Sequence, residues 1–215
     1  MKFTEFEKND NKGNRRCVYH SRVHPGETAL VQHGPQYFPI FVDIIRKFDP
    51  EVIIELGTLY GGLTLILHEA MPDVTIHTFD KVPQVKNELF DEEKVFFHIV
   101  DVLKEESHEL VSVMEDSPLS RKFLYCDNGD KAKEIEMYAK YLYYGDLLGC
   151  HDWQSRWNDC QSRLKLKNKK AIPALQKRVL PVLKELDFVQ IPENKMLIER
   201  DLFSRFWTKG GYRNL

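Results

Sequence analysis

A short apolar run that ends in a glycine-rich turn constrains the fold of this chain more than any other segment. The run Val52–Leu56 is rich in β-branched residues, and three glycines follow it: Gly57, Gly61 and Gly62. Such a run predicts a strand buried on both faces, as in a parallel sheet. Glycines let the backbone adopt positive φ and pass close to a ligand. The segment therefore predicts a central strand, a ligand-binding turn and a helix, although a tight turn without a ligand has the same pattern.

Strands and helices alternate along the rest of the chain. Apolar runs predict further strands at 74–80, 95–100, 122–126 and 147–150. Apolar residues at helical spacing predict helices at 35–48, 63–71, 105–114, 135–142 and 173–186. Two last runs, 188–191 and 196–200, flank a turn-like segment and predict an antiparallel pair. The expected fold class is α/β: a Rossmann-like, mostly parallel seven-stranded sheet with a terminal antiparallel hairpin and helices on both faces.

Three segments fall outside this alternation. Residues 1–34 are polar and lack periodicity, which predicts an N-terminal arm or cap ahead of a main domain at 35–200. Within that domain, residues 154–172 form a basic insertion. Residues 201–215 are expected to form a C-terminal tail whose aromatic side chains pack on the body or on a second subunit of a homo-oligomer.

The charge balance and the cysteines exclude several classes of protein. The formal net charge is −2, from 31 basic and 33 acidic residues, so no overall field attracts nucleic acid or an anionic membrane. The four cysteines have no CxxC spacing, which argues against a disulfide scaffold or a cysteine zinc site. The N-terminus is charged where a signal peptide needs apolar residues. We expect a soluble, cytoplasmic protein.

Acidic residues stand at the ends of the first three predicted strands of the sheet. The turn has the pattern GxxxGG instead of GxGxxG, which disfavours a nicotinamide dinucleotide. The Glu55 carboxylate suits a ligand with cationic groups, Asp80 is placed to accept hydrogen bonds from ribose hydroxyls, and Asp101 could reach an adenine edge. Each aspartate alone would more often be a solvated strand end, but together they favour a nucleoside site.

The turn resembles the first motif of class I S-adenosylmethionine-dependent methyltransferases. The matching residues are Glu55, Leu56, Gly57, Thr58, Gly61 and Gly62. Within that superfamily the chain is most similar to the cephalosporin hydroxylase-like and macrocin O-methyltransferase-like group, which resembles catechol-type, metal-assisted O-methyltransferases. The likeness runs from about residue 35 to 200. It departs at Leu63, where related enzymes often have serine, and the adjacent Thr64 is not an evident substitute.

The resemblance implies that S-adenosylmethionine is the cofactor and which residues hold it. The expected cofactor-binding residues are Glu55, Gly57, Thr58, Gly61, Asp80, Asp101 and Asp127.

A second acidic pair follows the next two predicted strands. Asp127 follows the strand at 122–126, and His151-Asp152 follows the strand at 147–150. Neighbouring strand ends would bring Asp127, His151 and Asp152 together as ligands of a divalent metal, magnesium being the first candidate. Histidine suits manganese, iron or zinc better, so the metal stays open. Alternatively, both aspartates cap helices.

Two residues near this pair are candidates for acid–base catalysis. His151 could act as a base instead of a ligand. Lys131 stands near the position where catechol-type enzymes have a lysine base, one residue out of register, and a solvated lysine in the first turn of a helix is an equally good interpretation.

The expected function is S-adenosylmethionine-dependent O-methylation of a hydroxylated small molecule, a sugar or natural product, with divalent-metal assistance. The alternatives are a non-catalytic cofactor-binding module, a nucleic-acid methyltransferase and an iron-dependent, hydroxylase-like enzyme. The basic insertion beside Trp153 and Trp157 could hold a phosphorylated, sulfated or nucleic-acid substrate by charge and stacking, although such charge runs are more often solvated surface. Against this, the aromatic-proline tetrapeptide of amino methylation is missing, because the segment after the fourth strand is Asp127-Asn128-Gly129-Asp130.

Overall fold

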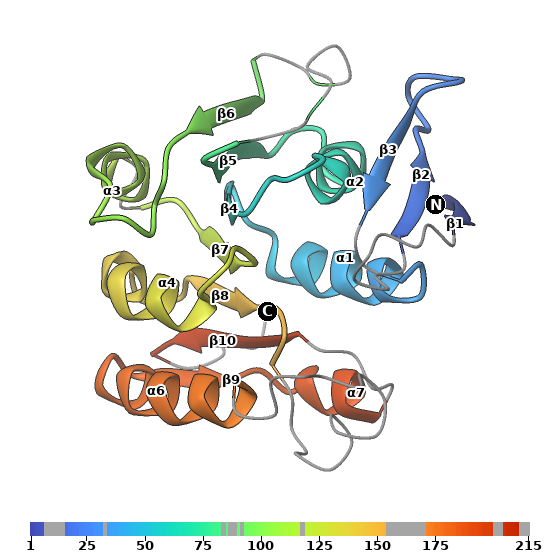
Figure 1. Ribbon diagram of the computed structural model, residues 1–215. Helices are drawn as coiled ribbons and strands as arrows, with labels where there is room; N and C mark the ends of the chain where they lie inside the picture. The colour runs from blue at the N-terminus through green and yellow to red at the C-terminus, as the bar shows by residue number, and fades with distance from the viewer. Residues whose placement is uncertain are drawn as a thin grey trace. The chain divides into compact units, whose positions relative to one another are not determined.

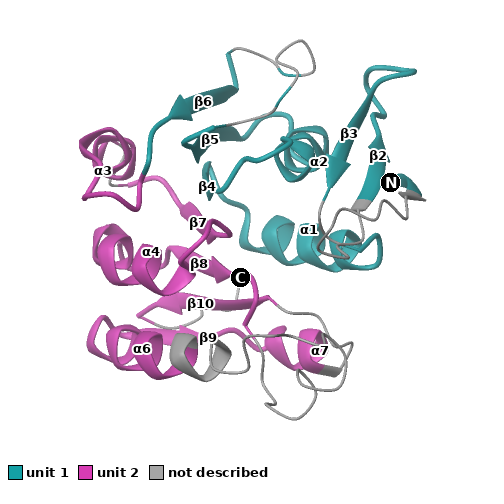
Figure 2. Ribbon diagram, in the orientation of Figure 1, with its two compact units in different colours: residues 1–101 teal, residues 102–215 magenta. Residues whose placement is uncertain are grey.

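The chain divides into two compact units, residues 1–101 and residues 102–215, in the computed structural model (Figure 1, Figure 2). The structure describes all residues except 7–15, 32–33, 83–84, 86–89, 91–92, 117–118, 154–170, 200–203 and 211–215. None of the helices in the described part combines the length and the apolar character needed to cross a membrane.

Three parallel strands form the main sheet of unit 1, in the order β6-β5-β4. They are β4 (Val52–Leu56), β5 (Thr75–Asp80) and β6 (Val95–Ile99). Helix α1 (Tyr37–Phe48) precedes β4, and helix α2 (Gly62–Ala70) follows it. The side chains of Ile53, Ile54 and Leu56 are completely buried. The predicted central strand and the helix after the glycine turn are therefore confirmed.

Unit 1 also contains a small antiparallel sheet that the sequence pattern did not indicate. Its strands are β1 (Lys2–Phe6), β2 (Arg16–His20) and β3 (Thr28–Val31), in that order. The Tyr19 hydroxyl donates a hydrogen bond to Glu69 Oε2 of α2 at 2.7 Å, and Ser21 Oγ donates one to Glu69 Oε1 at 2.6 Å. Charged and polar residues interrupt β1 and β2, whereas β4 is an almost continuous apolar run, so these strands have no clear signal in the sequence. The predicted boundaries of arm, main domain and tail stay predictions.

A substitution in α2 tests this packing. A Cβ atom on Gly62 would lie against the backbone carbonyl of Leu30 in β3, closer than van der Waals contact allows. Gly62→Ala is therefore expected to lower the free energy of unfolding by about 2 kcal/mol, measured by urea titration. The control is Gly129→Ala, whose added Cβ would meet its nearest atom, Leu103 Cδ1, at 3.9 Å; it should change stability by about 0.5 kcal/mol or less. Equal stability of the two variants would contradict the close approach of β3 to α2.

Unit 2 contains four strands in the order β7-β8-β10-β9, of which β7 and β8 pair in parallel and β10 runs antiparallel to both of its neighbours, β8 and β9. The strands are β7 (Lys122–Cys126), β8 (Leu147–Cys150), β9 (Phe188–Gln190) and β10 (Arg205–Lys209). The helices are α3 (His108–Glu115), α4 (Lys131–Tyr138), the short 3-10 helix η2 (Ala139–Tyr141), α6 (Ala171–Glu185) and α7 (Asn194–Glu199). Helix α4 lies beside α6 (Figure 1). The alternation and strand directions confirm the predicted α/β, Rossmann-like class.

One predicted element is wrong: residues 196–200 are not the second strand of the terminal hairpin. Residues 194–199 form helix α7, and the antiparallel partner of β9 is β10, which the sequence placed in a tail. The side chain of Asn194 is buried; its Nδ2 donates to the Phe206 carbonyl at 2.7 Å, and its Oδ1 accepts from the Phe206 N–H at 2.9 Å. These contacts fix α7 against β10. Phe206 and Trp207 are buried in unit 2, so these two aromatics of the predicted tail belong to the core.

Candidate active site

The glycine loop, residues 57–62, bends sharply after β4. Gly57 has a φ of 106° and donates its N–H to the Phe79 carbonyl at 2.8 Å. Gly61 has a φ of 70°. Leu59 has a φ of 47°, a conformation that costs a residue with a side chain roughly 1–2 kcal/mol. Because such strain collects at functional sites, the loop is a candidate for ligand binding.

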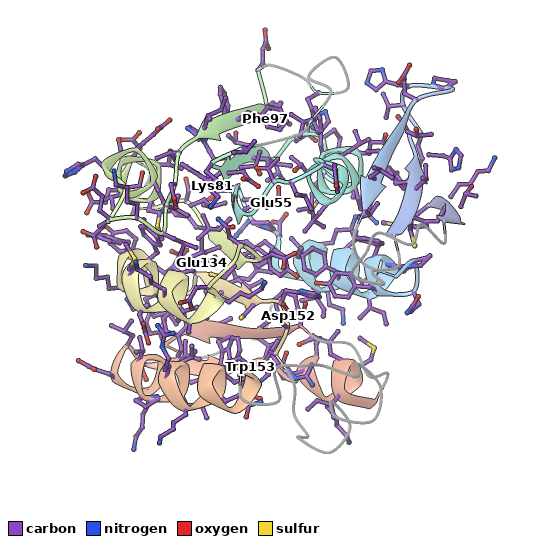
Figure 3. All side chains as sticks on the ribbon, viewed as in Figure 1. Glu55, Lys81, Phe97, Glu134, Asp152 and Trp153 are labelled. Carbon is purple, nitrogen blue, oxygen red and sulfur yellow. The ribbon has the colours of Figure 1, made fainter. Side chains whose placement is uncertain are left out.

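Glu55 belongs to a buried hydroxyl network, and Figure 3 labels it among the strands of unit 1. Its Oε2 accepts hydrogen bonds from Thr64 Oγ1 at 2.5 Å and from Thr78 Oγ1 at 2.7 Å, while Thr58 and Thr78 share a hydrogen bond of 2.5 Å. Only 1% of Glu55 is exposed. Thr64 therefore does take up a polar contact beside the buried Leu63, and Thr78 is a member that the sequence analysis missed. The sequence did not single it out, because the same strand also contains Thr75 and His77.

Asp80 is tied to the glycine loop at the end of β5. Its Oδ2 accepts a hydrogen bond from the Leu59 N–H at 2.9 Å, and its Oδ1 accepts one from the Val82 N–H at 3.0 Å. Each carboxylate oxygen can accept a second hydrogen bond. An acidic acceptor at the end of β5, bound to the glycine loop, is the kind of group that ribose hydroxyls donate to, so Asp80 suits the nucleoside part of the predicted cofactor. Asp101 is exposed after β6, and its role stays a prediction.

Four side chains of unit 2 form what we call the charge cluster: Asp127, Lys131, His151 and Asp152. His151 Nδ1 lies 3.1 Å from Asp127 Oδ1 and 3.3 Å from Asp152 Oδ1. Lys131 Nζ lies 3.0 Å from Asp152 Oδ2 and 3.6 Å from Asp127 Oδ1. The structure thus brings together all four residues that the sequence proposed here. Asp127 is not the cap of α4, because Asp130 takes that role by accepting the Lys133 N–H at 3.0 Å.

The charges of the cluster support one another. Burial acts to lower the pKa of Lys131 and of His151, but the Asp127 and Asp152 carboxylates outweigh it and raise the pKa of both. Burial acts to raise the pKa of Asp152, but His151 and Lys131 outweigh it and lower that pKa. Asp152 also has a φ of 56°, which aspartate tolerates better than most residues. The Lys131 ammonium, the His151 ring and two carboxylates are therefore held together after β7 and β8.

This arrangement does not fit a divalent ion. Magnesium and calcium need oxygen ligands at about 2.0–2.6 Å, whereas Asp127 Oδ1 and both Asp152 oxygens face the Lys131 ammonium or the His151 ring. An ion bound to Asp127 Oδ1 and Asp152 Oδ2 would lie within about 6 Å of a fixed positive charge. No group of three or more histidine, cysteine or acidic residues suited to a metal occurs in the part of the chain that the structure describes.

Glu134 is a buried acid that the sequence analysis missed. It lies on α4 (Figure 3), three residues after Lys131, and its side chain is fully buried. Within the described residues neither carboxyl oxygen has a hydrogen-bond partner. The Asn128 backbone N–H is nevertheless close enough to favour the charged form of Glu134. Burial raises the pKa of Glu134 to about 8. Helical spacing from Lys131 was the available signal, because residues three apart share a helix face.

The aromatic part of the predicted nucleic-acid patch is partly in the core. Trp153 is buried and meets Trp207 edge to face, with ring centroids 4.8 Å apart. It is therefore not placed to stack on a base. Trp157 and most of the basic insertion, residues 154–170, lie outside the described residues.

Comparison with solved structures establishes the fold. The sequence matches no family model and no curated protein sequence. A CmcI structure with Mg-SAM has a TM-score of 0.56 and 14% identity, over 83% of this chain and 73% of that chain. The SAH-bound methyltransferase PaMTH1 of Podospora anserina has a TM-score of 0.56 and 13% identity, over 82% and 79%. MycE of the mycinamycin pathway, in complex with Mg, SAH and mycinamycin VI, has a TM-score of 0.52 and 13% identity, over 82% and 51%. The predicted methyltransferase fold is confirmed.

Proposed function

We propose that the chain is an S-adenosylmethionine-dependent methyltransferase that methylates a hydroxyl oxygen of a small molecule. The proposal depends on the hydrogen bond between Asp80 and the glycine loop. Asp80 Oδ2 accepts it from the Leu59 N–H at 2.9 Å. This link places an acceptor for ribose hydroxyls beside the glycine loop. The fold shared with structures that contain S-adenosylmethionine or SAH supports the same ligand.

The charge cluster is proposed to prepare the acceptor. The bound cofactor would supply an electrophilic methyl group on a sulfonium sulfur. The acceptor oxygen would take this methyl group, the electron pair of the S–C bond would stay on sulfur, and the hydroxyl proton would pass to His151. Because His151 Nδ1 faces Asp127 and Asp152, Nε2 is the atom proposed to receive this proton. The products are a methyl ether and S-adenosylhomocysteine, and most of the rate would come from positioning.

A small-molecule acceptor is favoured over nucleic acid. MycE contains mycinamycin VI beside SAH, and the burial of Trp153 removes one of the two aromatic residues proposed to stack on bases. Metal assistance is a second variant, supported by the Mg in the CmcI and MycE structures. The position of Lys131 disfavours that variant here.

Asp80→Asn tests the cofactor site. Asparagine offers one oxygen instead of two, so the dissociation constant for S-adenosylmethionine, measured by isothermal titration calorimetry, should rise about 10- to 100-fold. The control is Asp73→Asn. Asp73 is exposed and lies just before the first residue of β5, so its substitution should leave the dissociation constant unchanged. The melting temperature without ligand shows whether the substitution has destabilised the protein at the glycine loop. Absence of binding to the parent chain, or equal affinity of parent and Asp80→Asn, would reject the proposal.

A further inference from the structure

The ammonium of Lys131 is fixed in place within the charge cluster. Lys131 is the first residue of α4, where the helix dipole disfavours a positive charge. Its side chain is nevertheless only 14% exposed, so it is not a solvated surface lysine. Its Nζ donates to the Asn128 carbonyl at 2.7 Å and lies 3.0 Å from Asp152 Oδ2. The carboxylates thus account for a lysine at an otherwise unfavourable position.

One N–H of this ammonium is left over. A lysine has three donors, and two of them are used by the Asn128 carbonyl and Asp152. Asp127 Oδ1 lies at 3.6 Å, within range of an ion pair but beyond hydrogen-bond distance. Among the described residues nothing else accepts a hydrogen bond from Lys131. The third N–H can therefore be directed at an oxygen of a bound molecule.

We propose that Lys131 takes the place of the divalent cation: its ammonium bridges Asp127 and Asp152 and binds the acceptor oxygen, so that methyl transfer in this chain needs no metal. The inference rests on the proposed function and deepens it. A compact positive charge next to the acceptor oxygen stabilises the oxyanion that develops as the hydroxyl proton leaves. A bound divalent cation stabilises the oxyanion in the same way. The matching acceptor class is a hydroxyl compound, because the third N–H of Lys131 can donate to its oxygen.

Titration with Mn²⁺, followed by electron paramagnetic resonance, tests this without any turnover. The parent chain should show no saturable binding up to about 1 mM Mn²⁺. Lys131→Met should gain one Mn²⁺ site with a dissociation constant at least about tenfold tighter than that limit, because two carboxylates and an imidazole are released. Lys133→Met is the matched control: this lysine is on the same helix and donates to the Leu103 carbonyl instead. It should behave as the parent.

Folding of the variants is checked by circular dichroism and thermal unfolding, and Mn²⁺ should raise the melting temperature of Lys131→Met alone. If Lys131→Met does not fold, Lys131→Gln serves, since its amide can still donate to the Asn128 carbonyl. One equivalent of Mn²⁺ on the parent chain, or no gained site in a folded Lys131 variant, would overturn the inference. Binding of S-adenosylmethionine is measured separately. A negative Mn²⁺ result therefore does not reject the proposed cofactor site, and a negative S-adenosylmethionine result does not reject the role of Lys131 in place of a metal.

Discussion

The Glu134→Gln variant is expected to be more stable than the parent chain at pH 8, by on the order of 3 kcal/mol in the free energy of unfolding. In the unfolded chain this carboxyl ionises near its ordinary pKa of 4.5, whereas in the folded protein burial holds the pKa at about 8. Between these values the folded state binds one more proton than the unfolded state, so the free energy of unfolding falls as the pH rises. Glutamine keeps the shape and has no charge to bury, so this loss disappears.

Urea titrations at about pH 5 and pH 8 measure the effect. The difference between the two pH profiles isolates Glu134, because the other titrating groups are shared. Glu136→Gln is the control on the same helix. Glu136 pairs with Arg178 at 2.5 Å near the surface, so its loss should cost about 1 kcal/mol or less and should keep the pH dependence of the parent. Identical profiles for the parent and Glu134→Gln would show that Glu134 is not a neutral, buried acid.

The Asp127→Asn variant is expected to lose about 100-fold or more in kcat, while its dissociation constant for S-adenosylmethionine stays within about threefold of the parent value. Asp127 Oδ1 faces His151 Nδ1 at 3.1 Å and Lys131 Nζ at 3.6 Å. Asparagine has the same size but removes the charge that orients the proposed base and the proposed oxygen-binding group. Steady-state kinetics with an acceptor found by screening hydroxylated compounds measure kcat, and calorimetry measures cofactor affinity.

Asp130→Asn is the matched control for this experiment. Asp130 follows β7 in the same segment, but it caps α4 and approaches Arg178 at 3.4 Å. Its loss should cost about 1 kcal/mol or less of stability and leave kcat within about threefold. A rise in the dissociation constant with unchanged kcat in Asp127→Asn would instead make Asp127 a cofactor contact, which is the other role that the sequence suggested for it.

The main strands were predictable because their signal is local. The runs at 52–56 and 122–126 became β4 and β7 without a shift in their ends. A strand buried on both faces needs apolar residues at successive positions, and a polar turn must follow it, so burial is visible in the chain itself. The Asp80 site could be anticipated for the same reason, since the carboxyl ends of parallel strands share one edge.

The last two elements show where local signals fail. Residues 194–199 and 205–209 both contain short apolar runs, and such runs are compatible with a helix or a strand. The position beside β8 and β9 is taken by the second run, which carries Phe206 and Trp207 into the core. Asn194, bonded to the Phe206 backbone, leaves the first run as helix α7. Which of the two runs pairs with β8 and β9 depends on the packing of the whole unit.

The alternating α/β architecture, the glycine loop and the acidic residues that follow the strands can be derived from the sequence alone, because periodicity and backbone freedom are properties of consecutive residues. What those acidic residues touch depends on the tertiary structure. It paired Asp127 and Asp152 with a lysine that the sequence could equally place in solvent, buried Trp153 and Glu134, and turned Glu55 toward threonine hydroxyls. The physical reason is that charge pairing and burial depend on distances between segments, and these distances exist only after the elements have packed.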